Sequence, residues 1–177
     1  MPWTPDKPEP LDDYVERLRG FRASFDRNEN FIYGAFSPDE QRVLGGTGLH
    51  ERVGERALEI GYWIRTDAVG QGLATELSAV LTRVAFERCG VDRVEIRVEP
   101  ANAASARVPR KLGYLEEATL RRRLPARSGE PLLDVVIFSM LVEELAASPC
   151  AAASYRAFDA AGREQRAAAA VYGPPRT

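Results

Sequence analysis

Two glycines, Gly70 and Gly72, stand between a segment typical of a strand and a segment typical of a helix. The first segment, 58–64, is rich in β-branched and aromatic residues, and the residues from 73 onward repeat apolar side chains at helical spacing. A glycine turn that opens a helix presents unpaired backbone N–H groups, and the helix dipole adds to their positive charge. The junction therefore predicts a site that holds a phosphate group.

The residues around this loop argue against two other phosphate-binding motifs. No Lys-Ser or Lys-Thr pair follows the glycines, as a nucleoside-triphosphate P-loop requires. The spacing also differs from that of the dinucleotide-binding fingerprint, and no acidic residue stands where a ribose would need one. Gly-x-Gly before a helix also fits an ordinary helix start, so the neighbouring segments decide its meaning.

The composition favours a single soluble domain and limits its partners. The chain has 177 residues, of which 45% are hydrophobic and 28% charged, as in ordinary globular proteins. A net charge of −2 and a longest basic run of Arg121–Arg123 do not favour non-specific nucleic-acid binding. No apolar run approaches membrane-spanning length and no signal-peptide core is present, so we expect a cytoplasmic protein with no membrane partner.

Few side chains are available for metal or disulfide chemistry. The chain has one histidine, His50, and two widely separated cysteines, Cys89 and Cys150. This pattern predicts reduced thiols and argues against a structural zinc site, and we expect no bound metal. The single histidine also disfavours a Ser-His-Asp hydrolase.

Hydrophobic periodicity predicts the elements that position the loop. We expect helices and strands in this order: helix 11–25 with one apolar face, strands 31–36, 43–50 and 58–64, helix 73–89, strand 93–98, a short helix from 102, and a closing antiparallel pair at 114–120 and 132–142. Residues 58–98 form a βαβ unit, so its two strands should be parallel. Gly61 predicts a bulge or a close backbone approach. The domain is expected to span 1–145, followed by an alanine-rich tail, 146–177, that is disordered or weakly helical.

Five blocks, in order, resemble the GNAT N-acetyltransferases, and most of all the RimJ/RimL-like branch: 59–64, 70–76, 93–96, 102–108 and 111–114. The resemblance covers about residues 30–142. It implies an α+β fold, in which a mixed, mostly antiparallel twisted sheet contains a central parallel strand pair splayed at the cofactor site and is flanked by helices. It also implies acetyl-CoA as co-substrate and a primary amine as acceptor, with a protein N-terminal amine first and a small amine second.

The resemblance further implies which residues contact the co-substrate. The pyrophosphate would lie on the loop at Val69, Gly70, Gln71, Gly72, Leu73, Ala74 and the Thr75 hydroxyl, and the pantetheine arm along Trp63, Ile64, Arg65 and Asn102. Ser105 matches the helix-start serine that assists the departing thiolate. Its hydroxyl could instead cap the helix, and Asn102 could serve only to fix the turn.

Three features depart from the family pattern. Val69 replaces the usual Gln or Arg, which should weaken phosphate binding without abolishing it, because backbone amides supply most contacts. Val108 stands where many relatives carry a tyrosine acid, so protonation of the thiolate would fall to Ser105 or water. The family's first strand and helix are missing before Pro2–Pro5, because either the start was assigned too far downstream or the chain is shortened. An open apolar edge beside 31–36 would follow and could support a homodimer.

Acetyl transfer to an amine needs a neutral amine, a stabiliser for the oxyanion and a proton for the thiolate. A peptide α-amine has a pKa of about 8 and a lysine of about 10.4, so an N-terminal amine needs little help from a strong base. Glu59 and His50 are the candidate bases, acting through water, although both also fit ordinary surface roles. Backbone N–H groups near Tyr62 or Trp63 are candidate oxyanion donors.

The closing strands carry charged residues that fit more than one role. Arg121–Arg123 fits a solvated strand end or a contact with acceptor or cofactor phosphate, and Glu130 and Asp134 would lie near the acceptor groove without an assigned role. A rival hypothesis of a different class is a non-catalytic acyl-CoA-binding or assembly module. The missing first strand and helix and the absent tyrosine are consistent with this hypothesis.

Overall fold

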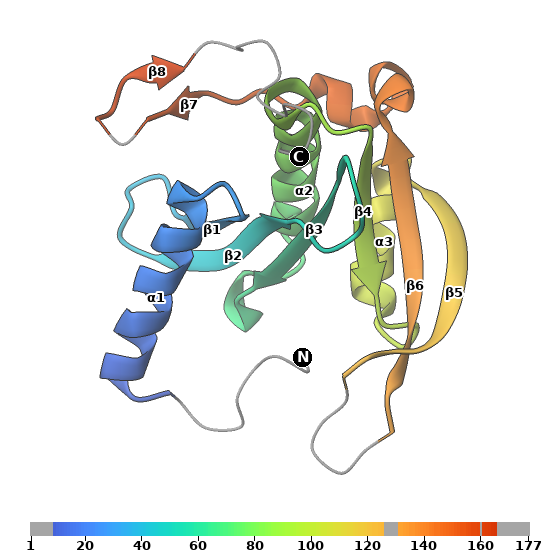
Figure 1. Cartoon of the computed structure of the whole chain (residues 1–177), viewed down its shortest axis with the longest axis horizontal. Helices are drawn as coiled ribbons and strands as arrows, with labels where there is room; N and C mark the ends of the chain where they lie inside the picture. The colour runs from blue at the N-terminus through green and yellow to red at the C-terminus, as the bar shows by residue number, and fades with distance from the viewer. Residues whose placement is uncertain (1–8, 126–130, 160, 166–177) are drawn as a thin grey trace.

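The computed structural model describes residues 9–125, 131–159 and 161–165, and its main body is a six-stranded sheet with helices packed on it (Figure 1). The strands are β1 (Asn30–Phe36), β2 (Val43–His50), β3 (Ala57–Ile64), β4 (Arg93–Val98), β5 (Leu115–Leu124) and β6 (Leu133–Leu141). Their order in the sheet is β1-β2-β3-β4-β6-β5. Only β3 and β4 run parallel; the other neighbours are antiparallel. The predicted α+β class and mixed sheet are confirmed.

The predicted elements are present, with some ends displaced. The longer helices are α1 (Leu11–Asp26), α2 (Leu73–Val84) and α3 (Ala103–Lys111). A π-helical turn, η2 (Ala85–Cys89), extends α2 and ends at Gly90, which caps it with a φ of 66°. The largest displacement is in β5, where a register shift after Leu120 lets pairing with β6 resume at Leu124.

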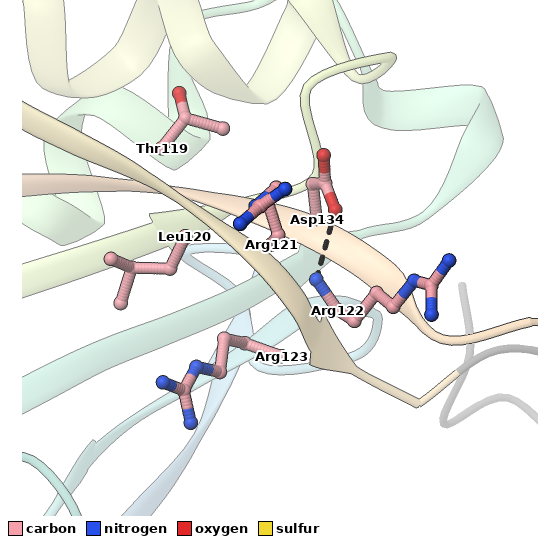
Figure 2. Close-up of a pocket in the computed structure, with 6 residues that line it drawn as sticks. All are labelled: Thr119, Leu120, Arg121, Arg122, Arg123 and Asp134. Carbon is pink, nitrogen blue, oxygen red and sulfur yellow. Dashed lines mark hydrogen bonds between the residues drawn. The ribbon is translucent and has the colours of Figure 1, made fainter.

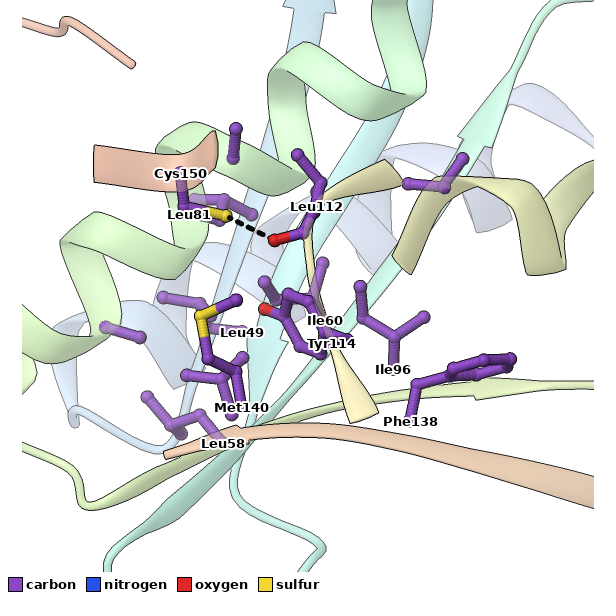
Figure 3. Close-up of a cluster of buried hydrophobic side chains, with 14 of the residues drawn as sticks. Leu49, Leu58, Ile60, Leu81, Ile96, Leu112, Tyr114, Phe138, Met140 and Cys150 are labelled. Atoms are coloured by element: carbon purple, nitrogen blue, oxygen red, sulfur yellow. Dashed lines mark hydrogen bonds between the residues drawn. The ribbon is translucent and has the colours of Figure 1, made fainter. Parts of the chain in front are cut away.

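Strand alternation builds the core on the face of the sheet toward α2 and α3 (Figure 3). Side chains of one parity on the central strands point to this face and are almost fully buried, as in Leu58 and Ile60 of β3, Ile96 of β4, and Phe138 and Met140 of β6. Side chains of the other parity are charged on β4, whereas those of β6 are mostly apolar and include the buried Val135 and Ile137. The central strands thus bury one face against the helices, and the other face carries both charged and apolar groups.

Two hydroxyls are buried within this core. The Thr82 hydroxyl donates to Ser78 O at 2.6 Å and lies 2.6 Å from Tyr114 Oη. Because the single Thr82 hydrogen is used on Ser78, the Tyr114 hydroxyl must donate to Thr82 Oγ1. Burial raises the pKa of Tyr114 well above its usual value, so it remains a neutral donor.

Replacing Thr82 by valine is expected to lower the free energy of unfolding by about 1–3 kcal/mol, because it leaves the buried Tyr114 hydroxyl without an acceptor. Urea unfolding followed by circular dichroism measures the loss. Adding Tyr114→Phe to Thr82→Val should restore part of that free energy. A double variant that loses the sum of the two single effects would contradict the hydrogen bond.

Helix α1 forms as predicted but does not bury its apolar face. Leu11 is 74% exposed, and no α1 residue is buried. Only its C-terminal end packs closely on the sheet, where the Phe25 ring lies 5.3 Å from that of Phe31 and 5.7 Å from that of Tyr33. β1 pairs with β2 alone among the described strands, so little sheet surface is available to cover the helix.

The expected disordered or weakly helical tail from 146 is wrong for the residues that directly follow it. A short 3-10 helix at Pro149–Ala152 places Cys150 in the core, fully buried beside the Leu112 carbonyl, and a small hairpin pairs Ala157–Phe158 with Glu164–Gln165. Cysteine acts here as a small apolar anchor. Both cysteines are free thiols, as predicted. The domain boundary at 145 stays a prediction, and 166–177 lie outside the described residues.

Candidate active site

The parallel pair β3 and β4 is joined over only part of its length. The ladder runs from Ala57↔Arg93 to Glu59↔Glu95, whereas the strands continue to Ile64 and Val98. Figure 1 shows the two arrows diverging beyond this point. The carboxyl halves of the two strands are therefore not paired with each other, and we call this unpaired region between them the slot.

Backbone groups of β3 face this slot. Arg65 N–H donates to Leu44 O of β2 at 2.9 Å. The alternation of an antiparallel ladder turns the amide of Trp63 to the same side. The amides of Tyr62 and Ile64 therefore face the other way, toward β4, where no strand pairing is recorded for them.

The expected bulge at Gly61 is wrong, because β2 and β3 pair in continuous register from Gly45↔Ile64 to His50↔Glu59. The alternative, a close backbone approach, is not found among the described residues either, because the group that lies close to Gly61 is the His50 side chain. A Cβ built on Gly61 would lie 3.3 Å from His50 Nε2, and one on Gly48 would lie 3.2 Å from the same atom. The two glycines give the imidazole ring its place on the sheet.

The glycine loop follows β3 through a single 3-10 turn, Thr66–Ala68. Gly70 and Gly72 have φ values of 80° and 87°, and a Cβ added to either would meet nothing within 4 Å. Gly72 caps α2 without any side-chain hydrogen bond, and Glu76 N–H is the first amide recorded as bonding back to Gly72 O, at 3.0 Å. The amides before it point into open space at the positive end of α2.

This loop fits the diphosphate of a coenzyme. It offers unpaired donors, an unobstructed approach and no acidic side chain between Gly70 and Thr75. The Val69 side chain is 58% exposed, so its replacement of Gln or Arg leaves the amide accessible. The sequence predicted the loop because its signal is local.

Asn102 and Ser105 meet at the start of α3. The Asn102 side chain is the N-cap, and its Oδ1 accepts from Ser105 N–H at 3.0 Å. The interpretation of the Ser105 hydroxyl as the cap is therefore wrong, while the turn-fixing role of Asn102 is confirmed. Capping uses the amide nitrogen of Ser105 and leaves its hydroxyl for other contacts.

The Ser105 hydroxyl lies 2.9 Å from Tyr62 Oη, and the Tyr62 hydroxyl also reaches Ser105 O at 3.1 Å. Burial raises the pKa of Tyr62, and the hydrogen bond with Ser105 opposes it in part, so the group is a phenol at neutral pH. Val108, where relatives carry a tyrosine, is buried in the core. In the sequence analysis, Tyr62 is only a candidate backbone N–H donor, and its side chain has no assigned role. The alternation of Leu58, Ile60 and Tyr62 along the strand is the sequence signal that indicates that this phenol points toward the helices.

The two candidate bases lie together on the opposite face of the sheet, as the cross-strand pair His50↔Glu59. His50 Nδ1 lies 3.1 Å from Asn30 Oδ1, which suits an N–H donor at Nδ1 and leaves Nε2 as an acceptor. Burial lowers the pKa of His50, the charge of Arg52 lowers it further and that of Glu59 opposes both, so the ring is neutral at pH 7. No hydrogen bond of Nε2 to a described residue is recorded.

Glu59 is buried and already engaged. Arg52 holds both carboxylate oxygens, at 2.6 and 2.8 Å, and Arg97 lies 3.7 Å away. Glu95, its neighbour on β4, pairs with Arg93 and Arg97 in the same way. A guanidinium group thus holds both oxygens of Glu59, whereas no described residue is hydrogen-bonded to His50 Nε2.

Other predicted residues lie farther from this chemistry. The Trp63 indole covers Gly46, and the Arg65 side chain pairs with Asp67 at 2.9 Å. Asp134 accepts a hydrogen bond from Arg122 N–H and so anchors a turn. Glu130 lies outside the described residues.

Within the described ranges, no group of three or more His, Cys, Asp or Glu side chains could hold a metal ion. No helix in the same part of the chain is long and apolar enough to cross a membrane.

Comparison with known proteins gives the family. A sequence model described as "Acetyltransferase (GNAT) domain" matches residues 1–115. The chain is 36% identical over 104 residues to YdaF of Bacillus subtilis, provisionally named a ribosomal N-acetyltransferase; the match covers 58% of this chain and 55% of YdaF.

Solved structures agree in fold. The crystal structure of a protein described as a probable acetyltransferase has a TM-score of 0.70 at 30% identity and covers 77% of this chain and 76% of its own. RimJ of Mycobacterium smegmatis, solved with CoA-disulfide, has a TM-score of 0.72 at 24% identity and covers 85% and 74%. The slot, the glycine loop and these similarities agree: the chain belongs to the GNAT family and is an acetyl-CoA-dependent N-acetyltransferase.

Proposed function

We propose that the chain acetylates a protein N-terminal α-amine, with a small primary amine as its second acceptor. The observation that carries the proposal is the slot between β3 and β4 beside the open glycine loop, since it offers one continuous backbone surface for a coenzyme. The name of YdaF supports a ribosomal-protein acceptor.

The residues present fit acetyl-CoA, which supplies the activated acetyl thioester when bound. The loop amides from Val69 to Ala74 would hold its diphosphate, with the Thr75 hydroxyl beside them. The backbone groups of Ile64 would pair with its amide arm in the way a neighbouring strand does. The side-chain NH₂ group of Asn102 remains available to the same arm, because the helix cap uses only the side-chain oxygen, Oδ1.

Ser105 would give its proton to the departing thiolate and regain one from water, so that its hydroxyl is restored. In the proposed state the Tyr62 hydroxyl donates its one hydrogen to Ser105 Oγ instead of to the Ser105 carbonyl, so that the serine hydrogen points outward. Tyr62 acts through Ser105 and is a positioning residue. The backbone amide of Tyr62, which faces the slot, is placed to stabilise the oxyanion.

His50 would take the proton released by the acceptor amine, through water. Its Nε2 lies over Gly48 and Gly61, which leave room for the imidazole ring on the face of the sheet opposite the helices. Glu59 and Arg52, paired beside it, keep the surrounding charge balanced.

Replacing His50 by glutamine is expected to lower kcat/KM at pH 7 by about tenfold, a modest effect because an α-amine of pKa about 8 is partly neutral already. A neutral ring is the active form and its pKa is lowered, so the parent enzyme should lose activity to His50 protonation only below about pH 6.5. The variant should lack that acidic limb. An unchanged limb in the pH profile of kcat/KM would assign it to another group.

A thiol-release assay tests the function. Acetyl-CoA is mixed with a panel of peptides with free N-termini, with polyamines and with lysine side-chain acceptors, and free CoA is detected by a thiol reagent. The proposal expects fastest turnover with a peptide α-amine, confirmed by mass spectrometry of the product. Binding of acetyl-CoA without turnover on any amine would favour the non-catalytic module.

A further inference from the structure

The β5–β6 hairpin carries three consecutive arginines, Arg121–Arg123, which the proposed chemistry leaves unused; we call them the arginine cluster. All three are exposed. Most other arginines of the described chain pair with an acid, as Arg52 does with Glu59 and Arg110 with Glu116. The cluster forms no ion pair with any described residue.

The backbone holds this cluster in an unusual conformation. Arg122 has a φ of 54°, a left-handed value that a side chain with a Cβ adopts only under strain. The register of β5 shifts between Leu120 and Leu124, and Arg122 N–H donates to Asp134 Oδ1 at 2.9 Å (Figure 2). Figure 2 also shows the three guanidinium groups fanning out in different directions. Asp134 therefore fixes this bulge in β5, and the three guanidinium groups point in different directions from it.

The cluster lies at the same end of the sheet as the slot, where β4 has its carboxyl end. Val98, the last residue of β4, pairs with Val136 of β6, which pairs with Thr119 of β5. The arginines follow Thr119 and so lie past the carboxyl end of β4, where the slot and the Asn102 turn also open. An open hollow of about 760 Å³ borders the cluster there.

We propose that the arginine cluster binds acidic side chains in the segment of the protein acceptor that follows the reactive amine. This inference rests on the proposed function and adds acceptor recognition to it. Arginine pairs with carboxylates through two parallel hydrogen bonds, and separated guanidinium groups suit several carboxylates on one extended segment.

The surroundings of the cluster favour a peptide over a nucleic acid. Glu116 and Glu117 lie on the same strand, and Asp134 lines the hollow. These carboxylates and the net charge of −2 would repel an extended polyanion more than a few discrete side chains. The hairpin does not present the continuous basic surface that nucleic-acid binding requires.

The test compares two acceptor peptides that differ only in two glutamates replaced by glutamines within the first six residues. The parent enzyme is expected to prefer the glutamate peptide by about tenfold in kcat/KM at low ionic strength, and less at high salt. The double variant Arg121→Gln/Arg123→Gln should reduce the preference below about twofold without changing the KM for acetyl-CoA. Arg122 is not substituted, so that the strained backbone at this position is unchanged.

The control is Arg156→Gln, an exposed arginine paired with Glu164 in the distant small hairpin, which should keep the full preference. Equal kcat/KM for both peptides in a parent enzyme that turns over would overturn the inference and leave the proposed function standing.

Binding of N-terminally acetylated, fluorescent forms of the two peptides decides the case in which no turnover occurs. Tighter binding of the glutamate form to the parent, lost in the double variant, supports the cluster even if the proposed function fails. Equal anisotropy for both forms overturns it. Tighter binding of a short single-stranded RNA than of the glutamate peptide would also overturn it, in favour of nucleic acid.

Discussion

Replacing Gly72 by glutamate should weaken acetyl-CoA binding at least about 100-fold, or about 2.7 kcal/mol. Two effects combine. The φ of 87° strains any residue with a Cβ, and the carboxylate would stand where the loop amides hold a diphosphate. Isothermal titration calorimetry with acetyl-CoA measures the loss. An unchanged dissociation constant would show that the diphosphate lies elsewhere.

Two matched variants separate the charge from the strain. Gly162, in the turn of the small hairpin, also has a positive φ, of 75°, and open space where a Cβ would stand. Gly162→Glu should therefore lower the free energy of unfolding by about 1 kcal/mol, as the strain at Gly72 does in Gly72→Glu. It should not change the affinity for acetyl-CoA. Gly72→Ala adds the strain without the charge and should weaken binding much less than Gly72→Glu.

The loop, the strand before it and the helix after it could be predicted because their signals are local. The glycine pair, the β-branched run before it and the apolar helical repeat after it lie within about thirty residues, and each has a direct physical cause. β2 and β4 have the predicted bounds, since a charged residue stands directly before and directly after each strand.

Contacts between distant residues could not be read in this way. Tyr62 and Ser105 are 43 positions apart, and no periodicity says that their hydroxyls meet. His50 takes its place because Gly48 and Gly61 stand on adjacent strands in register, which depends on how β2 and β3 pair. The predicted bulge at Gly61 failed for this reason: a glycine that makes room for a neighbour looks the same in sequence as one that breaks a ladder.

The exposure of α1 and the structure of the tail could not be read from the sequence for a different reason. Periodicity shows which face of α1 is apolar but not whether another element covers it, and Leu11 remains exposed. The tail was judged by its alanine content, whereas one buried cysteine, Cys150, is enough to attach it to the core. Single anchors of this kind leave no pattern in composition.

The Ser105 hydroxyl allows chemistry and structure to be separated by substitution. Its removal leaves the α3 cap intact, because Asn102 accepts from the Ser105 backbone, and leaves Tyr62 with the Ser105 carbonyl as an acceptor. Ser105→Ala should therefore preserve thermal stability, whereas Asn102→Ala should lose about 1 kcal/mol of stability with the cap.

Ser105→Ala is expected to lower kcat by about 100-fold, or about 2.7 kcal/mol, with acetyl-CoA affinity changed by less than about twofold, because a positioned acid contributes only in the transition state. Tyr62→Phe should lower kcat by about tenfold in the parent and have no further effect once Ser105 is alanine, since the phenol acts through the serine. Stopped-flow single-turnover measurements separate this step from product release. Independent, additive losses in the double variant would show that Tyr62 and Ser105 do not share one proton path. A melting temperature lowered by Ser105→Ala with kcat unchanged would give the hydroxyl a structural role instead.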